Sequence, residues 1–257
     1  AEDKRKEYLT ADPFPNIYFD NFFIPEKLQE VLDEFPDLKK KADYKFNDKN
    51  QIKLASKGEY RFGEKTKRFM HFLNSQTFLE FISTLTGIED LIPDAYFEGG
   101  GCHEIIPGGL LKIHADFNIH PRNKLDRRLN ILIYLNKDWD ESYGGHFELW
   151  DKEVKECKKK ILPVFNRMAL FSTTSFSYHG HPNPLTCPPD RSRKSLALYY
   201  YTNGRPGEEI TEALENHNTI FKDRAGTADM EPTWKKAIRL ITPPIIINGI
   251  KKITNHN

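Results

Sequence analysis

The sequence predicts an α+β protein, in which helices precede a β-rich core and a helical tail follows it. In the first third of the chain, apolar side chains recur at helical spacing. From about residue 99, short runs rich in β-branched, leucine and aromatic residues take over, separated by glycine-containing turns. Since no helical segments alternate with these runs, an antiparallel sandwich or barrel is favoured over a parallel sheet. We expect one structural domain in three parts, at residues 1–98, 99–204 and 205–257.

Two amphipathic helices are expected in the first part. Apolar side chains recur at i, i+3, i+4 and i+7 within residues 25–35, after a proline that a first helical turn tolerates. A similar stripe lies within residues 75–85, with Ser75 as the N-cap and Gly87 as the stop. Residues 39–67 are highly charged and weakly periodic, so we expect an exposed loop region there, which could act as a lid.

Short strands are expected in the second part, because β-type runs occur at residues 110–115, 129–135, 146–150, 168–171 and 195–202. The lysine-rich residues 155–160 are interpreted as a solvated turn. In the third part, the apolar residues between 234 and 250 are expected to pack on the core, with dimerisation as the second choice and contact with a membrane surface as a further alternative. The protein is therefore expected to be a monomer or a homodimer.

Composition limits the partners and the compartment. The chain has 257 residues, 38 of them basic and 37 acidic, and its net charge of +1 gives no reason to expect a nucleic-acid partner. No apolar run approaches the about 20 residues that span a bilayer. The charged first residues contain no apolar stretch of a signal peptide. Three cysteines without a C-x-x-C pair favour a reducing compartment, so we expect a cytoplasmic protein without a membrane span.

A candidate metal site begins with His114-Ala115-Asp116, at the end of an apolar run. Residues i and i+2 of a strand point to the same face, so the imidazole and the carboxylate would lie side by side. This donor pair suits Fe(II), Mn or Zn better than Ca or Mg. The competing interpretation is a surface pair, because a His-x-Asp sequence also occurs by chance.

A third donor is expected from His179 or His181, which follow an apolar run later in the chain. Either histidine could complete a 2-His-1-carboxylate set with open coordination positions. The two have equal parity, so geometry alone does not choose between them. We favour His179, because His181 precedes Pro182 and is biased towards a turn, and Gly180 allows a close backbone approach beside the site. His181 would then lie behind the ligands or face the substrate.

An anion site is expected where a basic run opens the last strand of the core. Arg193 stands closer to that strand than Arg191 does, and Ser195 shares its face. A buried guanidinium needs an anion, and its planar fork matches a carboxylate such as the distal one of 2-oxoglutarate. The alternative is a solvent-exposed basic turn.

These motifs occur in a characteristic order between residues 100 and 202. The ordered set is His114-x-Asp116, Arg128, the run from Tyr134 to Asp140 (YLNKDWD), Gly144-Gly145, His179 and Arg193. It resembles the prolyl-4-hydroxylase-like branch of the Fe(II)/2-oxoglutarate-dependent dioxygenases, in a bacterial or phage-type subgroup. The chain departs from the oxygen-sensing members at Ile106, where those carry a tyrosine near the Pro-Gly turn.

The resemblance implies a double-stranded β-helix core, which is a jelly roll of the cupin-like type, with flanking N-terminal helices. It implies that His114, Asp116 and His179 bind iron. It also implies that Arg193, with Ser195 on its face, and Tyr134 bind 2-oxoglutarate.

The implied activity is hydroxylation of an unactivated C–H bond of a peptidyl proline, an amino acid or a small metabolite, with release of succinate and CO2. Its cofactors are Fe(II), 2-oxoglutarate and O2, with ascorbate as a candidate reductant. Because halogenases leave the carboxylate position free for halide, Asp116 favours hydroxylation. One alternative is a non-catalytic cupin-like module that binds a small ligand. A zinc hydrolase is less favoured, since no general base is recognisable.

Overall fold

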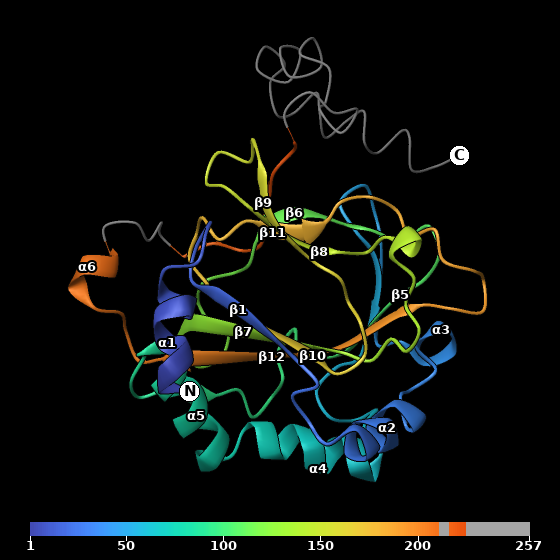
Figure 1. Cartoon of the computed structure of the whole chain (residues 1–257), viewed down its shortest axis with the longest axis horizontal. Helices are drawn as coiled ribbons and strands as arrows, with labels where there is room; N and C mark the ends of the chain where they lie inside the picture. The colour runs from blue at the N-terminus through green and yellow to red at the C-terminus, as the bar shows by residue number, and fades with distance from the viewer. Residues whose placement is uncertain (211–215, 225–257) are drawn as a thin grey trace. The chain divides into compact units, whose positions relative to one another are not determined.

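Two antiparallel sheets face each other in the computed structural model, which describes residues 1–210 and 216–224 (Figure 1). The larger sheet has the order β1-β10-β7-β12-β5-β3-β2, with β4 paired to β12, and the smaller has the order β13-β6-β11-β8-β9. The strands of the larger sheet are β1 (Asn16–Asp20), β2 (Tyr44–Asn47), β3 (Ile52–Ala55), β4 (Ile92–Pro93), β5 (Gly101–Ile105), β7 (Asp126–Tyr134), β10 (Arg167–Ser172) and β12 (Arg193–Thr202). Those of the smaller sheet are β6 (Leu111–Ala115), β8 (Phe147–Trp150), β9 (Cys157–Ile161), β11 (His179–His181) and β13 (Ile220–Phe221).

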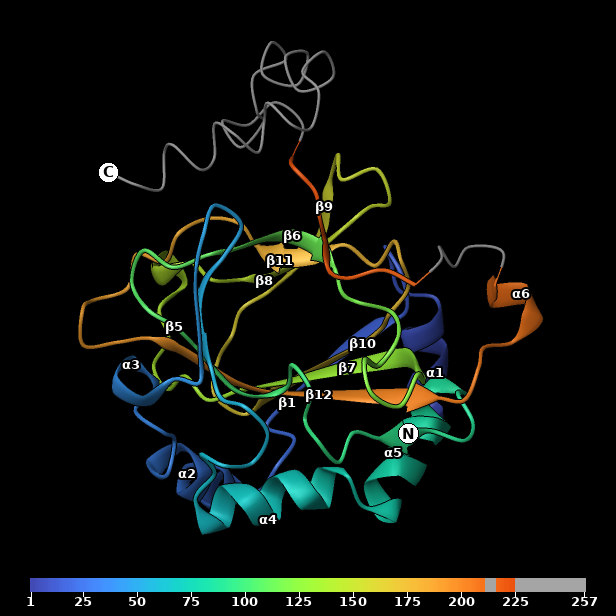
Figure 2. The same ribbon diagram turned by 180° about the vertical axis from the view of Figure 1, so that it is seen from behind.

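Helices cover the outer face of the larger sheet. Figure 2 shows α2, α4 and α5 on the side of that sheet opposite to β6, β8 and β11. The helices are α1 (Glu2–Leu9), α2 (Pro25–Asp33), α3 (Leu38–Lys41), α4 (Glu64–Leu73), α5 (Gln76–Thr86) and α6 (Gly207–Ile210), with a 3-10 turn at Glu141–Tyr143. None of the helices in the described part of the chain combines the length and apolar character that a bilayer crossing requires.

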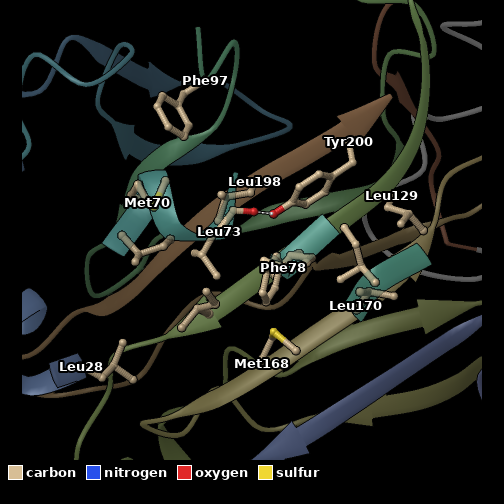
Figure 3. Close-up of a cluster of buried hydrophobic side chains, with 14 of the residues drawn as sticks. Leu28, Met70, Leu73, Phe78, Phe97, Leu129, Met168, Leu170, Leu198 and Tyr200 are labelled. Atoms are coloured by element: carbon tan, nitrogen blue, oxygen red, sulfur yellow. Dashed lines mark hydrogen bonds between the residues drawn. The ribbon is translucent and has the colours of Figure 1, made fainter. Parts of the chain in front are cut away.

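One face of the larger sheet packs against the helices and the other faces the smaller sheet, because successive side chains of a strand alternate in direction. On β12, Leu196, Leu198 and Tyr200 belong to the main hydrophobic core under the helices (Figure 3). The hydroxyl of Tyr200 donates a 2.8 Å hydrogen bond to the carbonyl oxygen of Leu73 in α4. The alternate residues of β12, which begin with Arg193, face the smaller sheet instead. The space between the sheets is therefore left for a polar site.

Most of the expected elements are present. The helices expected at residues 25–35 and 75–85 are α2 and α5, and Gly87 ends α5 in the left-handed region at φ +75°. Ser75 occupies the N-cap position of α5 without a side-chain hydrogen bond to the helix. The five expected strands correspond to β6, β7, β8, β10 and β12. The antiparallel sandwich is confirmed.

The prediction of a loop region at residues 39–67 is wrong. This stretch contains α3, the hairpin β2–β3 and the start of α4, and β3 pairs with β5 at the side of the larger sheet. Apolar and charged residues alternate along residues 44–46 and 52–54, which is the spacing of a strand. The high charge concealed this alternation. For the same reason residues 155–160, interpreted as a turn, instead contribute to the edge strand β9.

The third part of the chain is described in part. Residues 1–222 form one compact unit. Beyond β12, the described residues contain the short helix α6 and the strand β13, which pairs with β6. The apolar residues 234–250, expected to pack on the core, lie outside the described residues. The part boundaries expected at residues 98 and 204 stay a prediction.

Leu73→Ala should strongly destabilise the protein, because Leu73 is fully buried between α4 and the larger sheet. We expect the free energy of unfolding to fall by about 2–5 kcal/mol, which is the cost of the lost burial and the cavity. The control is Ile24→Ala, at a side chain that is 65% exposed, which should change it by about 0.5 kcal/mol or less. Urea unfolding measures both, and equal effects would contradict the described core.

Candidate metal centre

The side chains of His114, Asp116 and His179 meet between the sheets. His114 and Asp116 lie at the end of β6, and His179 on β11 is the register partner of His114. The Nε2 atoms of His114 and His179 lie 3.5 and 3.4 Å from the two carboxylate oxygens of Asp116. One donor atom from each of the three residues falls within 4.8 Å of the others. The structure therefore brings together the three residues expected to bind metal.

Both histidines are fixed with Nε2 towards this point. Nδ1 of His114 donates to the carbonyl oxygen of Lys112, and Nδ1 of His179 to that of Ser177, each at 2.8 Å. Because a carbonyl oxygen can only accept, Nδ1 carries the proton and Nε2 presents its lone pair. Burial lowers the pKa of His114. A neutral imidazole is the form that binds a metal.

The Asp116 carboxylate is oriented by two residues of β7. Oδ2 accepts hydrogen bonds from Arg127 Nη2 at 3.0 Å and from Asn130 Nδ2 at 2.7 Å. Burial alone would raise the pKa of Asp116, but the Arg127 charge and the neighbouring histidines outweigh it and keep that pKa well below its usual range. Oδ1, which lies beside His114, remains directed towards the donor cluster.

Arg127 itself is held rigidly, with 1% of its side chain exposed. Its Nε donates to Asn130 Oδ1 at 2.8 Å. Its guanidinium lies 3.5 Å from the ring centroid of Tyr199 and 4.5 Å from that of Phe117, where ring quadrupoles stabilise a cation. Sequence reasoning missed this residue. Strand alternation places Arg127 on the core face with Leu129, whereas the register shift opposite Tyr200 and Tyr201 brings it to Asp116.

Arg128, which the ordered motif set contained, lies away from the centre. It lines a separate cavity of about 1210 Å³ beside α1 and the end of β12. There it pairs with Glu209 at 2.7 Å, so its charge is neutralised. No histidine or cysteine is among the described residues that line this separate cavity, and the donor cluster remains the better candidate for chemistry.

The donor set fits a divalent transition metal. Two imidazoles and one carboxylate on one side leave the opposite side open to other ligands. Structural zinc sites are instead usually closed by four protein ligands. The ring of His179 packs against Phe171 and Phe147, with centroid separations of 4.7 and 5.5 Å. These contacts restrict its rotation.

A buried arginine lies beside the cluster, in what we call the arginine cavity, of about 70 Å³. Arg193, the first residue of β12, donates from Nε to the carbonyl oxygen of Gly145 at 2.8 Å and from Nη2 to the hydroxyl of Tyr134 at 3.3 Å. Among the described residues, no carboxylate lies within 4 Å of the Arg193 guanidinium. Ser195 also lines the cavity. A buried cation without a counterion is costly, so this cavity suits an anion.

Two glycines permit close packing around these groups. A Cβ atom on Gly145 would lie 2.6 Å from Leu185 and 3.0 Å from Arg193, and its φ of +71° favours glycine. A Cβ on Gly180 would lie 2.7 Å from the carbonyl oxygens of Leu111 and Lys112. Gly180 is therefore required by the approach of β11 to β6. This strand packing explains the glycine without a ligand beside it.

His181 lines the arginine cavity and is 3% exposed. Neither of its ring nitrogens makes a hydrogen bond. Burial, followed by the charge of Arg193, keeps its pKa well below the usual range, so the ring is neutral. It is not part of the three-residue donor cluster.

Two further residues of the site lie on strands that the sequence analysis did not predict. Lys53 on β3 and His103 on β5 both line the arginine cavity. They also line an adjoining space of about 300 Å³, here called the aromatic cavity, with aromatic walls that include Tyr44, Phe46, Phe117, Tyr199 and Phe221. Burial lowers the pKa of Lys53 to about 8.

A 2-His-1-carboxylate set with an open side is typical of mononuclear non-haem iron oxygenases. Residues 100–201 match the family model described as the 2OG-Fe(II) oxygenase superfamily. The match confirms the resemblance that the ordered motifs indicate.

Known proteins similar to this chain include prolyl hydroxylases. Mouse prolyl 3-hydroxylase OGFOD1 is 28% identical over 79 residues, which are 29% of this chain and 14% of the mouse protein. A prolyl-4-hydroxylase structure from Pseudomonas putida has 15% identity and a TM-score of 0.57, and the match covers 79% of this chain and 99% of that one.

A second solved structure is a prolyl hydroxylase from Trichoplax adhaerens, in complex with a peptide fragment of the hypoxia inducible factor oxygen degradation domain. It has 19% identity and a TM-score of 0.55, and the match covers 82% of this chain and 90% of that one. The two structural likenesses confirm the predicted jelly-roll core.

The pairing of Arg127 with Asp116 should be measurable in the metal-free protein. Arg127→Met should lower the free energy of unfolding by about 3–5 kcal/mol, because it leaves a partly buried carboxylate without its cation. Combined with Asp116→Asn, it should cost less than the sum of the single changes, with a coupling of about 0.5–3 kcal/mol. Urea unfolding of the four proteins gives this coupling, and additive effects would refute the pairing.

Proposed function

We propose that the protein is an Fe(II)- and 2-oxoglutarate-dependent dioxygenase that hydroxylates an unactivated C–H bond of a peptidyl proline, an amino acid or a small metabolite. The observation that carries the proposal is the open donor set of His114, Asp116 and His179 beside the buried, anion-free Arg193. When bound, Fe(II) would supply oxidative chemistry with O2 and 2-oxoglutarate, releasing succinate and CO2.

The arginine cavity would bind the cosubstrate. Arg193 would pair with the distal carboxylate of 2-oxoglutarate, and the Tyr134 hydroxyl, 3.3 Å from Arg193 Nη2, would donate to the same carboxylate. Ser195, on the face of β12 that carries Arg193, offers a third donor. Charge-assisted bonds of this kind set both affinity and direction, so the keto acid end would point towards the histidines.

Other residues would protect and orient the centre. Arg127 and Asn130 restrict the Asp116 carboxylate through Oδ2, which keeps its second oxygen in one position. The rings of Phe147 and Phe171 lie against His179 and exclude water from that side. A dry, preorganised site strengthens each electrostatic contact in it.

The substrate would enter through the aromatic cavity, which adjoins the donor cluster and shares His114 and Asp116 with the arginine cavity. Similarity to a mouse prolyl 3-hydroxylase and to a prolyl hydroxylase with a bound peptide supports an amino-acid or peptide substrate. We therefore rank proline-like amino acids and peptides first among the candidates.

Changes at the donor cluster should abolish iron binding. We expect His114→Ala, Asp116→Ala and His179→Ala each to lose bound iron and turnover, whereas His181→Ala should retain iron, because His181 lies outside the cluster. Iron analysis after anaerobic loading and desalting measures this directly. An iron-replete, active His179→Ala protein would transfer the third ligand to His181.

Arg193→Ala should weaken 2-oxoglutarate binding by about 2–5 kcal/mol, because it removes a desolvated partner of the carboxylate. The matched control is Arg191→Ala. Arg191 donates from Nη1 to the carbonyl oxygens of Lys137 and Asp138 at 2.9 and 3.2 Å near the surface, so its removal should have little effect. Titration of 2-oxoglutarate into the metal-loaded proteins gives the dissociation constants, and the reverse ranking would reassign the anion site to Arg191.

A further inference from the structure

Lys53 is a cation of the site that the proposed cosubstrate does not use. It lies on β3, two residues before Ala55, so the two side chains point to the same face of the sheet. Ala55 is the register partner of His103 on β5. The side chain of Lys53 therefore faces the space between the sheets, where it lines both the aromatic and the arginine cavity. Its ammonium lies 5.3 Å from the ring centroid of Phe46, across the β2–β3 hairpin.

No carboxylate lies within 4 Å of this ammonium among residues 1–210 and 216–224. The two acidic residues that line the aromatic cavity are already paired. Asp116 accepts from Arg127 at 3.0 Å, and Glu98 lies 3.4 Å from Arg122 Nε. The Lys53 ammonium therefore contacts the Phe46 ring but has no carboxylate counterion among the described residues.

The other cations of the site have their own anions. Arg127 is neutralised by Asp116. Arg193 would be neutralised by the distal carboxylate of 2-oxoglutarate. The keto acid end of the cosubstrate would bind the metal. Since a cation in a partly desolvated cavity is stabilised by an anion, the remaining charge on Lys53 calls for a negative group on the second substrate.

We propose that Lys53 binds the carboxylate of the substrate, and that the substrate is a free α-amino acid or its N-acyl derivative. This inference rests on the proposed function and narrows its substrate class. The aromatic cavity, at about 300 Å³, is at the lower limit of small-molecule pockets, which suits one amino acid better than a peptide. Its aromatic walls would pack against an apolar side chain or ring, such as that of proline.

The experiment compares proteinogenic L-amino acids with their α-amides, which lack the charge. Calorimetric titrations use the protein loaded with Mn(II) and N-oxalylglycine, an unreactive analogue of 2-oxoglutarate, and succinate formation is measured in parallel with Fe(II) and 2-oxoglutarate. We expect at least one acid to bind and to stimulate succinate formation, and its amide to bind about tenfold or more weakly.

Substitutions at Lys53 separate its charge from its packing. Lys53→Met, which keeps the apolar stem, should weaken binding of that acid about tenfold or more, and Lys53→Arg should restore much of it. The control is Lys45→Met in the same hairpin. Lys45 is exposed and opposite Leu54, on the other face, so this variant should bind the acid like the wild type.

Equal binding of acid and amide, or unchanged binding of the acid by Lys53→Met, would overturn the inference. So would the absence of any responding amino acid in a protein that binds 2-oxoglutarate. A tenfold or greater loss of 2-oxoglutarate affinity in Lys53→Met would assign Lys53 to the cosubstrate and overturn it as well. By contrast, a wild-type protein that binds neither 2-oxoglutarate nor its analogue would refute the proposed function itself.

Discussion

The ion pair between the half-buried Asp116 and the buried Arg127 connects the two sheets at the point where the proposed chemistry occurs. Asp116 follows a strand of the smaller sheet, and Arg127 lies on β7 of the larger one. A buried carboxylate is tolerated only when a cation and hydrogen-bond donors compensate its lost hydration. Arg127 and Asn130 supply both, so this contact joins the two sheets beside the histidines.

Strand alternation explains how one sheet serves both folding and function. On β7, Leu129, Ile131 and Ile133 belong to the core beneath the helices. The intervening side chains Asn130 and Leu132 line the arginine cavity. The core face stabilises the strand, and that stability in turn fixes the polar side chains on the opposite face. A site built on strands is positioned more accurately than one built on loops.

The sequence predicted the elements with clear periodicity and the motifs within one strand. The i, i+2 spacing of His114 and Asp116 and the strand start at Arg193 have local signals, and all three residues line the arginine cavity. The assignment of the three donors as iron ligands and of Arg193, Tyr134 and Ser195 as cosubstrate ligands stays a prediction. Lys53 could not be placed, because its contribution depends on the pairing of β3 with β5, about fifty residues later along the chain. Such long-range pairings leave no local signal.

The most direct test of the proposed metal centre is an anaerobic titration of Fe(II) into the metal-free protein, with and without 2-oxoglutarate. We predict a weak visible charge-transfer band that needs both components and saturates at one Fe(II) per chain, because the cosubstrate must chelate the metal on the open side of the three donors. A protein that binds 2-oxoglutarate but stays colourless when Fe(II) is added would contradict the proposed centre.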